Sequence, residues 1–196
     1  VTLLGTSRGG IIGMVIALVQ PQFLAGLMLN DVGPRLEPAG LLRIGKYVGA
    51  SPCYRDWATA ARSFAATQDG FSGVSAATWD AVVRRIYVET PEGIRPQHDP
   101  ALKTTFPDAE TIEAGKLPEL WDVIPALQQL PVSVLRGANS DLLSPETVER
   151  MAGLLPQLDA TSVAGRGHVP FLDEPESIAA IARWLSRVDA HEKGPG

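Results

Sequence analysis

The sequence has a single cysteine, Cys53, and only three histidines among its 196 residues. One cysteine excludes an internal disulfide framework and is typical of a reducing compartment, so we expect a cytoplasmic protein. No Cys and His residues occur at the spacing of metal ligands, so no metal site is predicted. Acidic residues outnumber basic ones by 22 to 17, and the basic residues are scattered. A nucleic-acid partner or a membrane surface is therefore not expected.

Long hydrophobic runs are also lacking. The longest apolar stretch, residues 11–19, is shorter than the roughly 20 residues that cross a bilayer. It has neither the basic leader nor the small-residue cleavage site of a signal peptide, so we interpret it as a buried helix. The apolar fraction of 45% still indicates a globular protein rather than a disordered one.

The most informative motif is Gly5-Thr6-Ser7-Arg8-Gly9, which lies between a strand-like run at residues 1–4 and the apolar helical run. A strand, a sharp turn and a helix with serine at the apex expose a nucleophilic hydroxyl above a sheet. We expect glycine at 5 and 9 because the residues on either side of such a serine crowd each other. The alternative is an idle serine in a glycine-rich turn, but the flanking strand and helix favour a nucleophile.

A serine hydroxyl needs a base to take its proton, and the base needs a third group to orient it. His168 lies on the glycine-rich loop 165–170, directly after a strand-like segment at 160–164. Such a loop can reach the end of a neighbouring strand. His98 lies in a polar, proline-flanked segment and His191 in the C-terminal tail, and each is interpreted as a surface or satisfied core residue. We therefore predict His168 as the base.

Two aspartates are candidates for the orienting acid. Asp141 follows a buried strand at 132–135 and precedes a helix that Ser144 caps and Pro145 begins. Asp31 follows a second apolar strand and also faces the predicted site, although it reads equally as a turn residue before Gly33. We favour Asp141 and keep Asp31 as the alternative.

Strand-like and helical segments alternate at both ends of the chain. Residues 1–34 have the pattern strand, helix, strand, and residues 126–190 continue with two further strands, each followed by a helix. This alternation predicts an α/β fold with a parallel sheet flanked by helices. Ligands bind such sheets beyond the carboxyl ends of the strands, where Ser7, Asp141 and His168 all fall.

The intervening residues 35–125 contain no clear strand, and so long a loop is improbable in a compact domain. Helical patterning instead predicts an inserted helical cap that covers the site and excludes water. Residues 191–196 are expected to form a tail. Most aromatic residues of the cap are predicted to form its core, with one or two lining a substrate pocket: Trp57, Phe64, Phe71 and Trp79.

The elbow around Ser7, the turn around Asp141 and the loop around His168 together resemble the α/β-hydrolase superfamily, in particular its capped bacterial esterases and C–C hydrolases. The resemblance implies an acyl-enzyme mechanism without a cofactor, in which the Arg8 N–H donates to the oxyanion. Serine at position 7 argues against dehalogenase and epoxide-hydrolase relatives, which have aspartate there. The expected reaction is hydrolysis of a small or medium ester. The alternative reaction is C–C bond hydrolysis of a 1,3-dicarbonyl-like compound.

The resemblance also implies strands ahead of the elbow strand and an upstream loop that supplies a second oxyanion donor. Neither is present before Val1. The apolar strand at residues 1–4 then becomes an exposed edge. We expect either a complementing N-terminal fragment or a homodimer through this edge. A further alternative is an inactive fragment or a non-catalytic binding module with the hydrolase fold.

Overall fold

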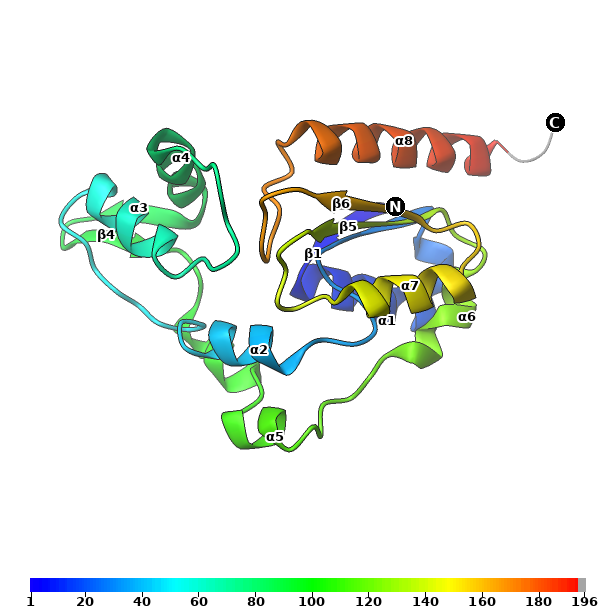
Figure 1. Cartoon of the computed structure of the whole chain (residues 1–196), viewed down its shortest axis with the longest axis horizontal. Coiled ribbons are helices and arrows are strands. Elements are labelled where there is room, and N and C mark those ends of the chain that lie inside the picture. Colours follow the sequence, from blue (N-terminus) through cyan, green and yellow to red (C-terminus); the bar gives the residue numbers. More distant parts are fainter. Residues whose placement is uncertain (194–196) are drawn as a thin grey trace. The chain divides into compact units, whose positions relative to one another are not determined.

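A computed structural model describes residues 1–193 of the chain (Figure 1). These residues divide into two compact units. The first comprises Val1–Glu37 together with the chain from Pro118 onward, and the second is Pro38–Leu117. The second unit lies inside the segment 35–125 that the sequence sets apart as an insertion.

The first unit is built on a four-stranded parallel sheet. Its strands are β1 (Thr2–Thr6), β2 (Gly26–Asn30), β5 (Val132–Gly137) and β6 (Asp159–Val163), in the order β1-β2-β5-β6. All three strand pairs are parallel, so the carboxyl ends of the strands meet at one edge of the sheet. The predicted fold class, a parallel sheet flanked by helices, is confirmed.

Helices cover both faces of this sheet (Figure 1). One face packs against α1 (Arg8–Val19), α6 (Ile124–Leu127) and α7 (Pro145–Leu154), and the other against α8 (Pro175–Glu192). Successive side chains of β2 point to opposite faces of the sheet and so contribute to two separate cores. Leu27 and Leu29 belong to the core on the side of α1, and Met28 belongs to the core on the side of α8. Two short 3₁₀ turns, η1 (Pro21–Phe23) and η3 (Trp121–Val123), complete the unit.

The ends of two helices test the sequence interpretation. At α7, Ser144 caps the helix by accepting a hydrogen bond from Thr147 N, and Pro145 occupies the first turn as expected. At α8 the prediction is wrong, because the helix extends to Glu192 and contains His191 instead of leaving it in a tail. No glycine or proline interrupts the helical pattern before Gly194. Residues 194–196 of the predicted tail lie outside the described residues.

The second unit consists of short elements. They are α2 (Pro38–Gly45), α3 (Trp57–Ala65), α4 (Ala76–Ile86), β3 (Tyr87–Thr90), β4 (Gly93–Pro96), η2 (Pro100–Thr105) and α5 (Ala109–Glu113). Asp56 and Ser75 cap α3 and α4 through hydrogen bonds to the backbone of Thr59 and Thr78. A small core joins α3 and α4 to the hairpin: Ala60, Ala61, Val83, Tyr87 and Ile94.

The hairpin β3–β4 differs from the prediction, which found no clear strand in residues 35–125. The helix ends at Ile86, and Tyr87 is already extended and pairs with Pro96. A turn after Thr90 leads to Gly93, whose φ of 133° is open to glycine but strained for other residues. Apolar residues at the end of α4 have β-branched or aromatic side chains that suit either structure, so periodicity alone misplaces this boundary.

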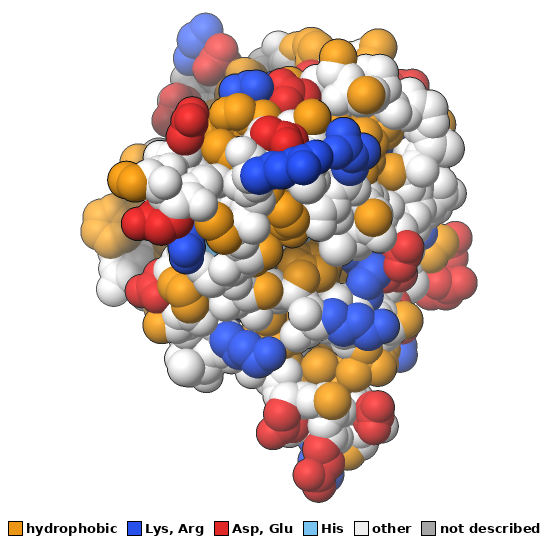
Figure 2. Space-filling view, turned by 90° about the vertical axis from the view of Figure 1, so that its left-hand side faces the viewer, with side chains coloured by type: hydrophobic (Ala, Val, Ile, Leu, Met, Phe, Trp, Pro, Cys, Tyr) orange, Lys and Arg blue, Asp and Glu red, His pale blue; other side chains and the backbone are white. Residues whose placement is uncertain are grey.

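Charged side chains of both signs occur on the face that Figure 2 shows. Figure 2 shows Lys and Arg on one face of the molecule, interleaved with acidic and apolar side chains. Within residues 1–193, no helix combines the length and the apolar character needed to cross a membrane.

Candidate active site

Ser7 lies at the turn between β1 and α1, where the chain leaves the sheet. Its φ of 49° and ψ of −116° place a non-glycine residue in a strained region, which is the backbone signature of a nucleophile elbow. The Ser7 N–H donates to Asn30 O at 3.1 Å, which ties the elbow to the end of β2.

The glycine requirement at this elbow is only partly as predicted. A Cβ on Gly5 would lie 2.5 Å from Gly10 N, so glycine is needed there. A Cβ on Gly9 would meet nothing within 4 Å, whereas one on Gly10 would lie 2.4 Å from the side chain of Val32. The close approach is therefore between the strand at Gly5 and the helix at Gly10, and Gly9 does not relieve it.

His168 lies beside Ser7, on the loop that follows β6. Its Nε2 atom is 3.0 Å from Ser7 Oγ, within hydrogen-bond distance. The imidazole is buried, with 6% of the residue exposed. The two residues are separated by 161 positions in the sequence, and the parallel sheet brings them together because both follow the carboxyl ends of strands.

The other nitrogen of the imidazole contacts Asp31, and this corrects the preference for Asp141. His168 Nδ1 lies 2.7 Å from Asp31 Oδ2, and Asp31 has no exposed surface. Asp31 directly follows β2, with φ of 56°, and its backbone N–H donates to Leu135 O at 2.8 Å. The residue that we kept as the alternative acid therefore occupies the position predicted for Asp141.

The turn after β5 explains why Asp141 does not take this position. Gly137 O accepts a hydrogen bond from Ser140 N, and this tight turn places Ser140 rather than Asp141 against the carboxylate of Asp31. Asp141 lies four positions beyond the end of β5, whereas Asp31 is the first residue after β2.

Two donors to Asp31 were not predicted from the sequence. Ser140 Oγ donates to Asp31 Oδ2 at 2.6 Å, and Gly137 N donates to Asp31 Oδ1 at 2.8 Å. Ser140 Oγ in turn accepts from the N–H groups of Leu142 and Leu143. These contacts satisfy a fully buried carboxylate and hold it in one orientation toward the imidazole.

The histidine loop is fixed by a second buried carboxylate, that of Glu174. Its Oε1 accepts from Arg166 Nε at 2.8 Å and from Phe171 N at 3.0 Å. Its Oε2 accepts from Leu172 N at 3.0 Å and from Ser177 Oγ at 2.8 Å. Burial by itself raises the pKa of Glu174, but these hydrogen bonds outweigh it and hold the pKa below its ordinary value.

Asn30 connects the elbow strand to the histidine loop. Its Nδ2 group donates to Thr6 Oγ1 and to Pro170 O, both at 3.1 Å. Thr6 directly precedes Ser7, and Pro170 lies two positions after His168. One buried amide thus sets the spacing between the segments that carry the hydroxyl and the imidazole.

The remaining predicted site residues lie in different places. Arg8 is the first residue of α1, so its backbone N–H is at the positive end of the helix dipole beside Ser7. In the second unit, Phe64 lies beside Trp79, which also contacts Phe71 at 5.4 Å between ring centroids. The ring of Trp57 stacks under the Arg84 guanidinium. Among residues 1–193 no cluster of three His, Cys, Asp or Glu side chains is arranged to hold a metal ion.

Fold and elbow together define a class of protein. The chain belongs to the alpha/beta hydrolase family, whose model matches residues 1–181.

Particular members of this family resemble the chain over nearly its whole length. A 3-hydroxybutyrate-oligomer hydrolase from Cupriavidus necator is 33% identical over 188 residues, which are 93% of this chain and 64% of that protein. The crystal structure of an alpha/beta hydrolase from Novosphingobium aromaticivorans superposes with a TM-score of 0.81 at 36% identity, covering 94% of this chain and 64% of that one.

A more distant structure, an E-2-(acetamidomethylene)succinate hydrolase, shares the fold with a TM-score of 0.70 at 22% identity, covering 94% of this chain and 66% of that one. The chain thus spans about two thirds of the length of these relatives.

Proposed function

We propose that the protein is a serine hydrolase that cleaves a carboxylic ester through an acyl-enzyme, with Ser7 as nucleophile, His168 as base and Asp31 as the orienting acid. The observation that carries the proposal is the continuous line of hydrogen bonds from Ser7 Oγ through both imidazole nitrogens to Asp31. The strained elbow supports the role of Ser7, because it presents the hydroxyl at the edge of the sheet.

In the proposed reaction Ser7 Oγ attacks the ester carbonyl while its proton passes to His168 Nε2. Asp31 accepts the hydrogen bond from Nδ1–H and stabilises the imidazolium that forms. The tetrahedral intermediate breaks its bond to the alcohol oxygen, which takes the proton from Nε2 and leaves. Water then attacks the acyl-enzyme, with His168 again removing a proton and returning it to Ser7 Oγ. The products are the carboxylic acid and the alcohol.

In the transition state, negative charge develops on the carbonyl oxygen of the substrate. Hydrogen-bond donors are needed to stabilise it. The Arg8 N–H, at the N-terminus of α1, is the proposed first donor. Within residues 1–193, β1 pairs only with β2, so its other edge is free to pair with a further segment. We propose that the second donor lies on such a segment. Loss of one such donor typically lowers the rate about 100- to 1000-fold.

Exposed large apolar side chains on α1 also support a further segment. On α1, Ile12, Val15 and Leu18 are between 41% and 52% exposed, although this helix is apolar on all sides. A helix of that kind is normally buried on both faces. The greater length of the relatives is consistent with such a segment.

The substrate class rests on the relative of known name. The protein from Cupriavidus necator is a 3-hydroxybutyrate-oligomer hydrolase, and an oligomer of a hydroxy acid is joined by ester bonds. We therefore propose short-chain esters, including hydroxyacyl esters, as substrates.

The test is labelling by a fluorophosphonate together with hydrolysis of p-nitrophenyl acetate and butyrate. We expect the probe to attach to Ser7, and Ser7→Ala to abolish both labelling and turnover. A matched control is Ser162→Ala, which removes an exposed serine at the end of β6 and should change neither. Cleavage of a vinylogous 1,3-diketone without ester cleavage would replace the ester proposal with C–C bond hydrolysis. Absence of both activities and of labelling would overturn the proposed mechanism.

A further inference from the structure

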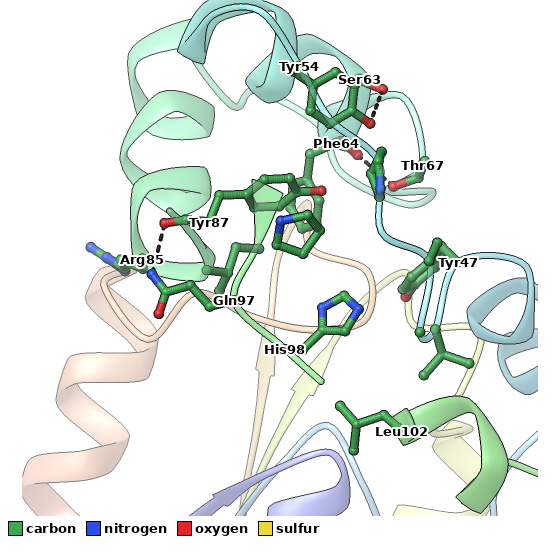
Figure 3. A pocket seen from close by; sticks show the side chains of 16 residues that line it. Tyr47, Tyr54, Ser63, Phe64, Thr67, Arg85, Tyr87, Gln97, His98 and Leu102 are labelled. Atoms are coloured by element: carbon green, nitrogen blue, oxygen red, sulfur yellow. Dashed lines mark hydrogen bonds between the residues drawn. The ribbon is translucent and has the colours of Figure 1, made fainter. Parts of the chain in front are cut away.

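The second unit contains a cavity of its own, formed wholly by residues 47–102 (Figure 3). Its volume is about 770 Å³, within the range of small-molecule sites. Aromatic rings form much of the wall: Tyr47, Tyr54, Phe64 and Tyr87, with the imidazole of His98 beside them. This cavity is formed by residues other than Ser7, Asp31 and His168.

The lining is apolar and almost uncharged. It contains no Asp or Glu, and Arg85 is its one Lys or Arg. In Figure 3 the guanidinium end of Arg85 points away from the group of aromatic rings. A cavity with this wall favours an uncharged ligand, since no opposite charge is placed to compensate the desolvation of an ion.

One hydroxyl in the wall has no protein partner. Tyr87 is 8% exposed, yet within residues 1–193 its hydroxyl has no hydrogen-bond partner. Its backbone is held by Gln97 Nε2, which donates to Tyr87 O at 2.8 Å, and its ring contacts those of Tyr54 and Phe64. By contrast the hydroxyl of Tyr54 is paired with Ser63 Oγ at 2.8 Å. Because Tyr87 lines the cavity and its hydroxyl is not held by another side chain, this hydroxyl is available to a ligand in the cavity.

The protonation state of the Tyr87 hydroxyl determines whether a ligand group beside it acts as a hydrogen-bond donor or acceptor. Burial, with a smaller contribution from the neighbouring Tyr54, raises the pKa of Tyr87 to about 12. The phenol therefore keeps its proton at neutral pH and acts as a hydrogen-bond donor. A matching ligand carries an acceptor such as a carbonyl oxygen.

We propose that this cavity is a binding site for an uncharged small molecule with an aromatic or branched aliphatic body and a carbonyl oxygen that accepts a hydrogen bond from Tyr87. The walls of this cavity come from the second unit alone, so the proposal needs none of Ser7, Asp31 and His168. The same ligand chemistry fits an ester substrate, a ketone product or a separate effector.

The experiment is calorimetric titration of the Ser7→Ala protein, which cannot turn the ligand over. Two probes of similar shape are compared: 4-phenyl-2-butanone, which has the carbonyl, and butylbenzene, which lacks it. We expect saturable binding of both. Tyr87→Phe should weaken the ketone about 3- to 10-fold, the range of one neutral hydrogen bond, and change the hydrocarbon less than about 2-fold.

Tyr54→Phe is the matched control. It removes a phenol whose hydroxyl is already paired with Ser63, so ketone affinity should stay within about 2-fold. Phe64→Leu reports on the same wall without touching a hydroxyl, and it should weaken both probes by a similar factor. Circular dichroism and thermal melting establish that each variant is folded.

Several outcomes would overturn the site. One is failure of both probes to saturate, and another is equal weakening of ketone and hydrocarbon by Tyr87→Phe. Should Tyr87→Phe fail to fold, unchanged affinities in Phe64→Leu would overturn the proposal by themselves. Because binding is measured without turnover, none of these results bears on the roles of Ser7, His168 and Asp31. An enzyme inactive toward esters would likewise leave the binding result intact.

Discussion

The two units of the chain assemble their functional geometry in opposite ways. In the first unit, the groups at the site come from positions 7, 31, 140 and 168, and hydrogen bonds join them across separations of 109 to 161 residues. In the second unit, α3, α4 and the hairpin follow one another along the chain and pack together. The Tyr54 and Ser63 hydroxyls that meet there are nine residues apart.

This difference predicts where substitutions have their strongest effects. At the first site each residue is held by the register of the parallel sheet, so one lost contact affects partners on several strands. The cavity of the second unit is formed by local contacts, so its single substitutions are expected to act mostly on binding. The variants below test that contrast.

Asp31→Asn is expected to give the largest effect. The amide that replaces the carboxylate no longer stabilises the imidazolium, and it favours the wrong tautomer of His168. We expect kcat for ester hydrolysis to fall about 10³- to 10⁴-fold with little change in the melting temperature. Steady-state kinetics with p-nitrophenyl butyrate give the measurement.

Asp141→Asn is the matched control for Asp31→Asn, because both replace an aspartate at the end of a sheet strand. It should change kcat by less than about 5-fold, since Asp31 occupies the Nδ1 side of His168. The reverse ranking of the two variants would restore Asp141 as the orienting acid.

Much of the first unit could be predicted from the sequence because its signals are local. The elbow glycines, the apolar strands and the capped helix at Ser144 each have a short pattern with a physical cause. The choice between Asp31 and Asp141 could not, because both follow buried strands. The path of the turn from Gly137 to Ser140 decides which aspartate lies beside His168. The hydrophobic periodicity of the sequence does not predict that path.

The second unit was harder to predict for a different reason. The residues from Val82 to Val88 suit a helix and a strand equally well, and packing against Ala60 and Ala61 selects where one ends and the other begins. Neither Ser140, which donates to Asp31, nor Glu174, which accepts from the histidine loop, belongs to a recognisable motif. Their roles depend on which backbone groups a loop brings within reach, and the loop's course is set by tertiary contacts.

Glu174→Gln tests the loop that carries His168, and the expected effect is on stability. The amide keeps the shape but loses the charge that accepts from Arg166, Ser177 and two backbone N–H groups. We expect the free energy of unfolding to fall by about 2–3 kcal/mol, the range for hydrogen bonds to a buried charge. Urea denaturation at pH 7 gives the value. Exposed Glu176, in the first turn of the helix that Glu174 precedes, supplies the control Glu176→Gln, expected within about 0.5 kcal/mol.

The pH dependence of stability follows from the same carboxylate. Its pKa is lowered in the folded protein from an ordinary value of 4.5, so the unfolded state takes up the proton more readily. The stabilisation is complete above that value and is lost as the pH falls through the lower folded pKa. The wild-type protein should therefore lose more stability between pH 6 and pH 3 than Glu174→Gln, measured by urea denaturation at each pH. Parallel curves for the two proteins would contradict this role.

Ser140→Ala should have a smaller effect on catalysis. Ser140 is a positioning residue, because it acts on His168 through Asp31. Removing one donor to the carboxylate should lower kcat about 5- to 20-fold and leave KM unchanged, since the hydroxyl does not contact the proposed substrate carbonyl. Ser140→Thr keeps a hydroxyl and should recover most of the loss. A rise in KM at constant kcat would instead assign Ser140 to substrate binding.

The smallest expected effect belongs to the second unit and completes the contrast. Tyr54→Phe removes one hydrogen bond between partly buried groups, the one between the phenol and Ser63 Oγ, and should lower the free energy of unfolding by about 0.5–1 kcal/mol. The kcat for ester hydrolysis should remain within about 2-fold of wild type, because Tyr54 is held by Ser63, Tyr87 and Ile94 of its own unit. Ser63→Ala should have a similar effect on stability, and the double variant should show non-additivity if the pair acts as one unit. A loss of kcat comparable to that of Ser140→Ala would show that the second unit is coupled to the first more tightly than its local contacts indicate.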